Sequence, residues 1–309
     1  MSKPNWFYNL RNFPARVTVY CLIFISRILP ADRSILFGGN FGVLVWHLFP
    51  QWRKTSLRNI ELFFDGQKSR SEAWQIGRSA ARNVGYHVME FILMGHRRVE
   101  DIIGMVVETE GEAEYRAAYD EGKGVICLGM HYGNWELSAT WMQTQVRQIH
   151  AVGKKQSDPF FTEIAFPWRS RFGVQNIFAG SQANSAILKA LKNGDGLGLV
   201  ADINGGTTGL FVPFAGILAS TVPGPGVLGV RSGAPMFLTI CRRLAPGRHR
   251  FIARRLNLEG LPEDRKAAQL EILTRVNSLY ESVIREDPTQ WLWGHKRWKT
   301  RPQGESWLY

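Results

Sequence analysis

One stretch of the sequence, residues 125–136, decides the fold: the apolar run VICLGM is followed directly by the polar box HYGNWE. The run is short, apolar and bounded by turn signals, which predicts a buried strand. A turn, EGKG, precedes it at residues 121–124, and residues 136–146 have the pattern of a helix. The box therefore lies in a strand-to-helix turn, where backbone N–H groups are unpaired and side chains project beyond the edge of a sheet.

Two side chains of this box, His131 and Glu136, are candidates for acid–base chemistry. A neutral imidazole can take a proton from a hydroxyl, and a carboxylate can fix its tautomer and stabilise the imidazolium. Positions five apart on an ideal helix point roughly 140° away from each other, so the pair can meet only across an irregular backbone, which Gly133 permits. We therefore expect His131 to be a general base that Glu136 orients. The alternative is a histidine that only packs.

Two other chemistries of this region are less favoured. A zinc site would need a third ligand from the distant His150, His295 or Asp202, and their spacing is not typical of metal ligands. A nucleophilic Cys127 is disfavoured because its apolar neighbours would raise the pKa of the thiol rather than lower it. The stretch GPGVLG at residues 224–229 matches the dinucleotide-binding pattern only formally, because no strand immediately precedes it. We expect neither a metal nor another cofactor.

Beyond the box, strand-like runs alternate with helical patterns, which is typical of an α/β domain. The region 52–94 is mainly helical, and 110–121 is a further helix. We predict a single α/β domain at residues 52–309, with a central mixed sheet flanked by helices, preceded by a helical, membrane-associated segment at residues 1–51. Further strands are expected at residues 149–152, 174–178, 197–201, 211–212, 236–240 and 250–256, and further helices at 159–172, 182–192, 224–231 and 263–285.

The N-terminal segment is apolar but lacks the pattern of a spanning helix. The run 17–25 is closed by arginines and is too short, since a span needs about 20 residues, and glycines interrupt the next apolar stretch, 34–51. No small-residue cleavage site follows, so we do not expect a secretory signal. Interleaved aromatic and basic residues favour an amphipathic anchor in the membrane interface, with a single spanning helix as the alternative. These residues are Lys3, Trp6, Phe7, Tyr8, Arg11, Phe13 and Arg16.

The composition indicates an anionic partner and a reducing compartment. The formal net charge is +12 and the sequence pI is about 9.9, which favours an acidic membrane surface, a phosphorylated glycolipid, an acidic carrier protein or nucleic acid. Three cysteines in apolar neighbourhoods suit a cytosol-facing protein without disulfides. The tryptophan-rich basic run 291–301 is compatible with lipid phosphates or with simple packing. No nucleic-acid-binding signature accompanies it, so we expect no nucleic-acid partner.

Four segments of the chain, in order, carry a family resemblance. Residues 59–64 are similar to an Asn-Leu…Cys-Phe-Pro segment, with Asp65 in place of the proline, and residues 131–137 match a His-x-Gly-Asn-Trp-Glu-Leu box. Residues 211–221 match Phe-Val-Pro-Phe-Phe-Gly…Ala-x-Thr, and residues 290–302 match Tyr-Leu-Trp-x-His-Arg-Arg-Phe-Lys-x-Arg-Pro. In these motifs the chain resembles the bacterial lipid A biosynthesis acyltransferases, the late acyltransferases that include the lauroyl and myristoyl enzymes.

The resemblance implies a fatty acyl transfer from an acyl carrier protein or acyl-CoA donor to a hydroxyl of a lipid A precursor, at the cytoplasmic face of the inner membrane. It also implies that Arg171 is functionally important, with Arg169 as the neighbour that could be confused with it. Asp202, which ends an apolar strand, is kept from the family's Pro-Asp-Gln. Ile203 replaces the glutamine, which leaves another glycolipid or a lysophospholipid open as the acceptor.

For this chemistry we expect His131 to deprotonate the acceptor hydroxyl as it attacks the thioester. Backbone N–H groups near Gly133 and Asn134, with help from Arg171, would bind the oxyanion of the tetrahedral intermediate. No covalent enzyme intermediate is required. The remaining alternative is a basic peripheral protein that binds an anionic membrane or nucleic acid without catalysis, and for such a protein salt would abolish binding.

Overall fold

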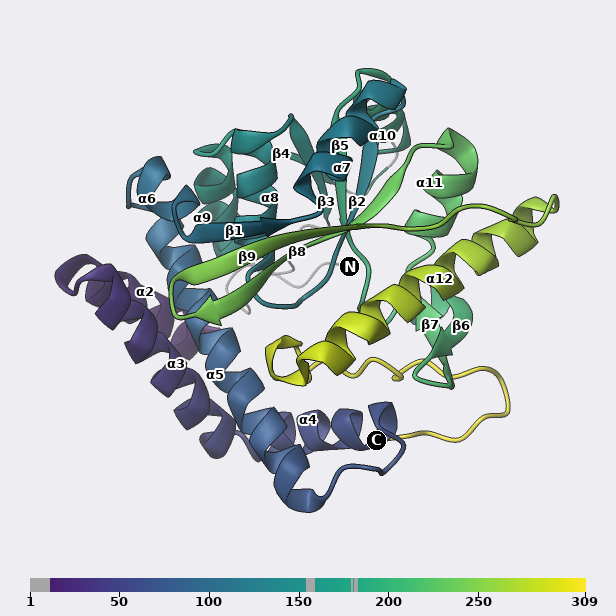
Figure 1. Ribbon diagram of the computed structural model, residues 1–309. Coiled ribbons are helices and arrows are strands. Elements are labelled where there is room, and N and C mark those ends of the chain that lie inside the picture. Colours follow the sequence, from purple (N-terminus) through teal and green to yellow (C-terminus); the bar gives the residue numbers. More distant parts are fainter. Residues whose placement is uncertain (1–11, 154–158, 179, 181–182) are drawn as a thin grey trace.

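The computed structural model describes residues 12–153, 159–178, 180 and 183–309. A seven-stranded mixed sheet lies at its centre, in the order β1-β9-β8-β2-β5-β3-β4 (Figure 1). Strands β8 and β9 are antiparallel, whereas the other neighbours in the sheet are parallel. The expected α/β class with a mixed sheet is confirmed. The strands are β1 (Val106–Glu110), β2 (Val125–Gly129), β3 (Ile149–Gly153), β4 (Gln175–Phe178), β5 (Gly196–Val200), β8 (Met236–Ala245) and β9 (Arg248–Arg255).

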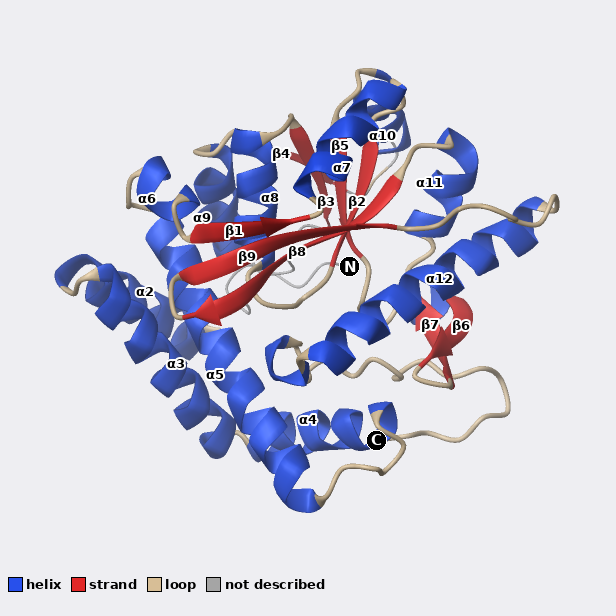
Figure 2. Ribbon diagram, in the orientation of Figure 1, coloured by secondary structure: helices blue, strands red, loops and turns tan. Residues whose placement is uncertain are grey.

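Helices cover both faces of this sheet (Figure 2), which explains why β2 is apolar throughout. Ile126 and Leu128 face a layer that includes α10, α11 and α12, whereas Cys127 faces a layer that includes α5, α7 and α8. Burial on both sides fixes β2 as the middle of the core. The helices are α5 (Arg70–Met94), α7 (Glu112–Ala117), α8 (Trp135–Gln145), α9 (Pro159–Ser170), α10 (Ala183–Lys192), α11 (Gly224–Ser232) and α12 (Arg265–Glu286), with the short α6 at Val99–Ile103.

The N-terminal helices α2 (Phe13–Ile28), α3 (Ala31–Leu48) and α4 (Pro50–Phe63) lie along α5 at one side of the molecule (Figure 1). Helix α3 approaches α5 very closely: a Cβ added to Gly85 would lie 2.1 Å from the carbonyl oxygen of Gly38. The glycines of α3 thus serve helix packing. Among the described residues, no helix is long and apolar enough to cross a membrane. Of the expected anchor, Lys3, Trp6, Phe7, Tyr8 and Arg11 lie outside the described residues.

Three strand assignments differ from the sequence-based expectation, and one of them is β7 (Ile217–Thr221), which was not expected. The expected strand 211–212 exists, but it belongs to β6 (Leu210–Phe214), which pairs with β7 in a hairpin separate from the central sheet. Strand β1 was not expected, because three of its five residues are exposed and its polar sequence lacks the pattern of a buried strand.

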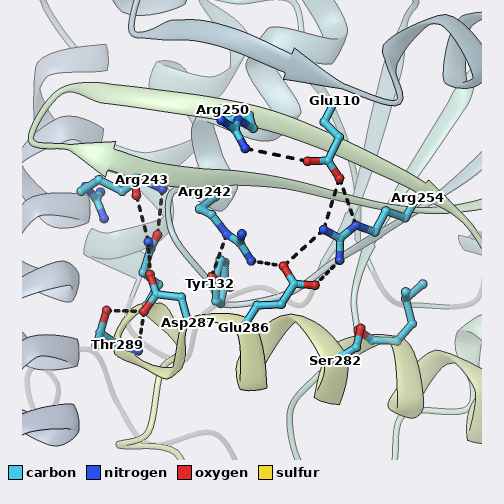
Figure 3. A network of polar contacts seen from close by, with 12 residues as sticks. Glu110, Tyr132, Arg242, Arg243, Arg250, Arg254, Ser282, Glu286, Asp287 and Thr289 are labelled. Atoms are coloured by element: carbon cyan, nitrogen blue, oxygen red, sulfur yellow. Dashed lines mark hydrogen bonds and ion pairs between the residues drawn. The ribbon is translucent and has the colours of Figure 1, made fainter.

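An ion network ties α12 to the outer part of the sheet (Figure 3). The carboxylate of Glu286 on α12 accepts hydrogen bonds from Arg242 on β8 and Arg254 on β9. Arg254 also donates to Glu110 on β1. At its inner end, Arg242 donates to the phenolic oxygen of Tyr132, over 3.2 Å. We call these five residues the surface network.

Candidate active site

The polar box follows β2 and forms the sharp turn that its glycine predicted. Gly133 has a φ of +58°, and an added Cβ would lie 2.1 Å from the carbonyl oxygen of Cys241, so only glycine fits. The N–H of Gly133 donates to the Gln290 carbonyl, and the N–H of Asn134 donates to that of Cys241. The Asn134 side chain caps α8 by accepting from the N–H of Leu137. Both N–H groups are thus already engaged, which does not favour the oxyanion role expected for them.

His131 pairs with Asp202, and the pairing follows from the sheet. Gly129 at the end of β2 is level with Val200 at the end of the parallel β5, so the next residues of both strands emerge side by side. Nδ1 of His131 lies 2.8 Å from Oδ1 of Asp202, and the backbone N–H of His131 donates to Oδ2 over 2.9 Å. Trp291 donates its indole N–H to the same Oδ2 over 2.8 Å. The carboxylate is therefore held by three hydrogen bonds.

Electrostatics fix the protonation of this pair. Burial acts to lower the pKa of His131, but the adjacent Asp202 carboxylate outweighs it and the pKa is raised above 6.5. Burial acts to raise the pKa of Asp202, yet hydrogen bonds from His131 and Trp291 lower it below 3.8. An ionised carboxylate only accepts hydrogen bonds, so Nδ1 of His131 carries the proton. In the neutral ring, Nε2 then has the free lone pair that a general base needs.

Glu136 does not pair with His131, and this corrects the sequence-based expectation. Its carboxylate accepts two hydrogen bonds from Arg169 on α9, from Nε over 2.7 Å and from Nη2 over 2.5 Å. Burial acts to raise the pKa of Glu136, but Arg169 outweighs burial and the pKa is lowered. Glu136 pairs with Arg169 rather than with His131 for a physical reason. A buried carboxylate needs a cation of matching geometry, and a guanidinium supplies it through two hydrogen bonds.

Of the two neighbouring arginines, Arg169 lies at the site and Arg171 does not. Arg171 donates to the backbone carbonyls of Met94 and Arg97, over 2.6 and 3.1 Å. It thereby ties the end of α9 to the end of α5. Residues two positions apart lie on nearly opposite sides of a helix, so only one of the pair can face inward. The cavity is thus lined by Arg169 and not by the favoured Arg171, and the functional importance expected for Arg171 stays a prediction.

A cavity of about 680 Å³ opens beside the box, between the sheet and helices α5, α8 and α9. His131, Glu136 and Arg169 line it, while most of its other walls are apolar. The cavity reaches down to the sheet because one row of the sheet carries only small side chains. In this row, Gly198 of β5 lies between Cys127 of β2 and Ala151 of β3. The site thus combines an oriented base, a cation and a deep apolar cavity. Further lining residues are Phe91, Ala139, Met142, Ile149, Val152, Phe166, Val174 and Leu199.

Comparison with known proteins shows the family of the chain that carries this site. A family model described as bacterial lipid A biosynthesis acyltransferase matches residues 9–300. The chain belongs to that family. It is similar to the lipid A biosynthesis palmitoleoyltransferase of Escherichia coli (strain K12), with 27% identity over 285 residues that cover 91% of this chain and 90% of that protein. It is 26% identical over 281 residues to the lauroyltransferase of the same organism, covering 89% and 88%. The predicted class of enzyme, an acyltransferase, is confirmed.

The C-terminal run of this acyltransferase packs against the backbone of the polar box. Leu292 donates its backbone N–H to the carbonyl of His131, and Tyr132 forms a β-bridge with Trp291. The run was considered for lipid contact, but Trp291, Trp293 and Trp298 are buried. Sequence analysis missed the bond from Trp291 to Asp202. No local pattern reports it, because the two residues lie 89 positions apart.

The other titratable groups near the acyltransferase site behave as expected from their surroundings. Cys127 is buried, and burial raises the pKa of its thiol to about 11, which opposes a role as nucleophile. Within the described part of the chain, no three histidine, cysteine or carboxylate side chains are grouped to hold a metal ion. His295 accepts a hydrogen bond from the backbone N–H of Asn204 and thereby ties the C-terminal run to the loop after Asp202.

Proposed function

We propose that this acyltransferase moves a fatty acyl chain from the thioester of an acyl carrier protein or coenzyme A to a hydroxyl of a lipid A precursor, with His131 as the general base. The observation that carries the proposal is the His131–Asp202 pair at an apolar cavity. His131 lines the cavity, and its Nε2 is the nitrogen left without a proton. The apolar walls match the chain that the thioester carries.

In this reaction His131 serves both as the general base and as the group that returns the proton. The acceptor hydroxyl attacks the thioester carbonyl while Nε2 of His131 takes its proton. Asp202 stabilises the imidazolium that results, through the Nδ1 hydrogen bond of 2.8 Å. When the tetrahedral intermediate collapses, the C–S bond breaks and the thiolate takes the proton back from His131. The ester product and the free thiol leave an unchanged enzyme.

Arg169 is the group best placed to stabilise the oxyanion. It lines the cavity, and its pKa is raised because Glu136 outweighs the effect of burial, so it is charged at all working pH values. The N–H groups of Gly133 and Asn134 are engaged elsewhere. Glu136 then acts as a positioning residue, which fixes the guanidinium rather than the imidazole.

One residue, Ile203, bears on the choice of the acceptor lipid. Ile203 lines the cavity next to Asp202, at the position where the family has glutamine. An apolar side chain there removes a hydrogen-bonding group from the acceptor side of the site. This favours testing a second candidate acceptor, another glycolipid or a lysophospholipid, beside the lipid A precursor.

We also propose that helices α2 and α3 dock on the cytoplasmic face of the inner membrane. They expose a row of large apolar side chains, and Val19 of α2 and Val88 of α5 connect this row to the cavity. The exposed Arg27 and Arg33 can meet lipid phosphates beside it. Docking in this way would let a lipid reach the site without crossing water. The row comprises Phe13, Val17, Tyr20, Phe24, Ile28, Leu36, Phe37, Leu44, Leu48 and Phe49.

The function is tested with purified full-length protein and defined substrates. The protein is incubated with acyl carrier protein or coenzyme A thioesters and with either a lipid A precursor or a lysophospholipid, and products are measured by mass spectrometry. We expect a mass gain of one acyl chain on the lipid A precursor, and no gain with His131→Ala. A gain only on the lysophospholipid would overturn the proposed acceptor. No gain on any lipid would overturn the proposed function.

Membrane docking is tested by sedimentation with anionic lipid vesicles. We expect Phe24→Glu with Ile28→Glu to weaken binding strongly, because two charges enter the apolar row. The matched control is Leu270→Glu, an exposed apolar position on α12, which should bind as the wild type does. Equal binding by all three proteins would place the docking surface elsewhere.

A further inference from the structure

The largely apolar cavity contains, besides His131, Glu136 and Arg169, a cluster of buried polar side chains beside the reacting centre. These are His87 of α5, Ser138 of α8 and Thr239 of β8, which we call the polar lobe. Their exposed fractions are 6%, 3% and 2%. Nδ1 of His87 and Oγ of Ser138 have no hydrogen-bond partner among the described residues. Buried polar groups without partners are rare in folded proteins and call for a reason.

Ser138 and Thr239 are brought together by the junction between α8 and β8. The backbone N–H of Asn134, at the start of α8, donates to the carbonyl of Cys241 on β8. Ser138 lies one turn along α8 from this point, near the thiol of Cys241, but no hydrogen bond of ordinary geometry joins the two side chains. Thr239 precedes Cys241 by two residues and so lies on the same face of the strand. The two hydroxyl groups therefore share one corner of the cavity.

The same corner adjoins the reacting centre through Trp135. The centroid of its ring lies 5.0 Å from that of His131 and 3.5 Å from that of His87. Ser138 follows Trp135 by three residues, so both lie on the cavity face of α8. The polar lobe is thus about one helical turn away from the base. With the thioester carbonyl at His131, as the proposed acyl transfer requires, the lobe would meet the first carbons of the acyl chain rather than its tail.

Other hydroxyl groups of α8 show what is unusual about Ser138. Thr140 and Thr144 each donate to the carbonyl four residues earlier in the helix, which is the ordinary solution for a helical hydroxyl. Ser138 makes no such bond and lines the cavity instead. His87 is available in its neutral form, because burial lowers its pKa to about 4. A neutral imidazole offers one donor and one acceptor.

We propose that the polar lobe binds a hydroxyl group on the acyl chain, a few carbons from the thioester carbonyl, so that the preferred donor is a hydroxyacyl thioester. The inference rests on the proposed acyl transfer and adds the chemical class of the donor. A plain hydrocarbon would leave the lobe unpaired, whereas a hydroxyl donates to one of its members and accepts from another. A site built to bind a hydroxyl discriminates against the analogue that lacks it.

The test is a competition between two donors that differ only in this hydroxyl. Wild-type protein receives equal amounts of dodecanoyl and 3-hydroxydodecanoyl thioesters on the same carrier, and the ratio of products is read by mass spectrometry. We expect the hydroxyacyl product to exceed the other by about fivefold or more, the ratio that corresponds to one unpaired buried group. Ser138→Ala and Thr239→Val should each lower this ratio toward one.

The matched control is Thr140→Val, which removes a buried hydroxyl from the same helix but away from the cavity. It should keep the wild-type ratio. A wild-type ratio of one overturns the inference, and so does a preference that survives in both lobe variants. Loss of transfer of both donors in equal measure would assign the lobe to the reacting carbonyl instead, and would equally overturn it.

Binding of the two thioesters to the wild-type protein, measured by calorimetry, separates the inference from the function on which it rests. Tighter binding of the hydroxyacyl thioester without any acyl transfer would support the lobe and overturn the acyltransferase chemistry. Equal binding of both thioesters, with transfer of both, would overturn the lobe and leave the chemistry standing.

Discussion

Two sets of arginine–carboxylate pairs flank the polar box, and they differ in the exposure of the carboxylate. On the cavity side, Glu136 pairs with Arg169, and their side chains are 6% and 27% exposed. On the opposite side, Glu286 pairs with Arg242 and Arg254 in the surface network (Figure 3), where the three side chains are 36%, 18% and 28% exposed. Both sets contain the same chemical groups at similar distances.

This difference in the burial of the carboxylate distinguishes a pair that belongs to the active site from pairs that only hold α12 to the sheet. A carboxylate removed from water is costly to leave unpaired, so Glu136 depends on its single partner. Exposed pairs are screened by water and salt, so the surface network contributes little free energy per pair. The chemistry adjoins the buried pair, whereas the surface network reaches the box only through the Tyr132 hydroxyl. Four substitutions test this contrast, beginning with the base itself.

The largest effect is expected for His131→Ala. Loss of a positioned general base should lower kcat by roughly 100-fold or more, while circular dichroism and the melting temperature stay close to the wild type. Initial rates of acyl transfer by the purified variant measure it. A folded variant that turns over at nearly the wild-type rate would remove His131 from the mechanism.

Asp202→Asn should come next, with a diagnostic pH dependence. In the wild type, kcat/KM should rise with pH through the pKa of His131, which Asp202 holds above 6.5, because only the neutral ring accepts a proton. Without the carboxylate, the main influence that raises the pKa of His131 is lost, so the rise should move to lower pH. The maximal rate should fall by about 100-fold, because an amide no longer fixes the tautomer. An unchanged pH profile would contradict the pairing.

Glu136→Gln should have a moderate effect that appears in stability as well as in turnover. It should lower the free energy of unfolding by about 1–2 kcal/mol, less than for a fully buried pair because Arg169 is partly exposed. The folded-state pKa of Glu136 is lowered, so this difference should be fully present above pH 4.5 and shrink as the pH falls below it. Denaturant unfolding at several pH values measures it. If the midpoint of the kcat–pH profile shifted as much as in Asp202→Asn, Glu136 would act on His131 rather than on Arg169.

The smallest effect is expected for Glu286→Gln in the surface network. Its cost in free energy of unfolding should stay below about 1 kcal/mol and decrease further at high salt, because the pairs are exposed. Acyl transfer should remain within about twofold of the wild type, as for most surface substitutions. The same rate and unfolding assays decide it. A tenfold loss of activity would show that the network acts on the box through Tyr132.

Sequence patterns predicted the strand, the turn and the helix around the box because each signal is local. The apolar run that begins at residue 125, the glycine at 133 and the start of the helical pattern at 136 lie within twelve residues of one another. The partners of the two acidic residues could not be predicted in this way. Asp202 reaches His131 because two parallel strands end at the same level, and which acid reaches the imidazole depends on that register.

The choice between Arg169 and Arg171 shows the same limit on a smaller scale. Two positions on one helix differ by nearly half a turn, and only the placement of α9 against α8 and α5 decides which one faces the cavity. The apolar cavity itself was not foreseen. It depends on Gly198 lying between Cys127 and Ala151, a row assembled from three strands.

Trp291 is synthesised later than the two residues of the pair that it supports, His131 and Asp202. Its indole N–H completes the set of three hydrogen bonds on Asp202, but it is made 89 residues later. At the usual rate of translation of about 5–20 residues per second, that interval lasts roughly 4–18 s. During this time a growing chain already contains His131 and Asp202 but lacks the segment that locks them together. The hydrogen-bond set on Asp202 is therefore complete only after residue 291 has been made.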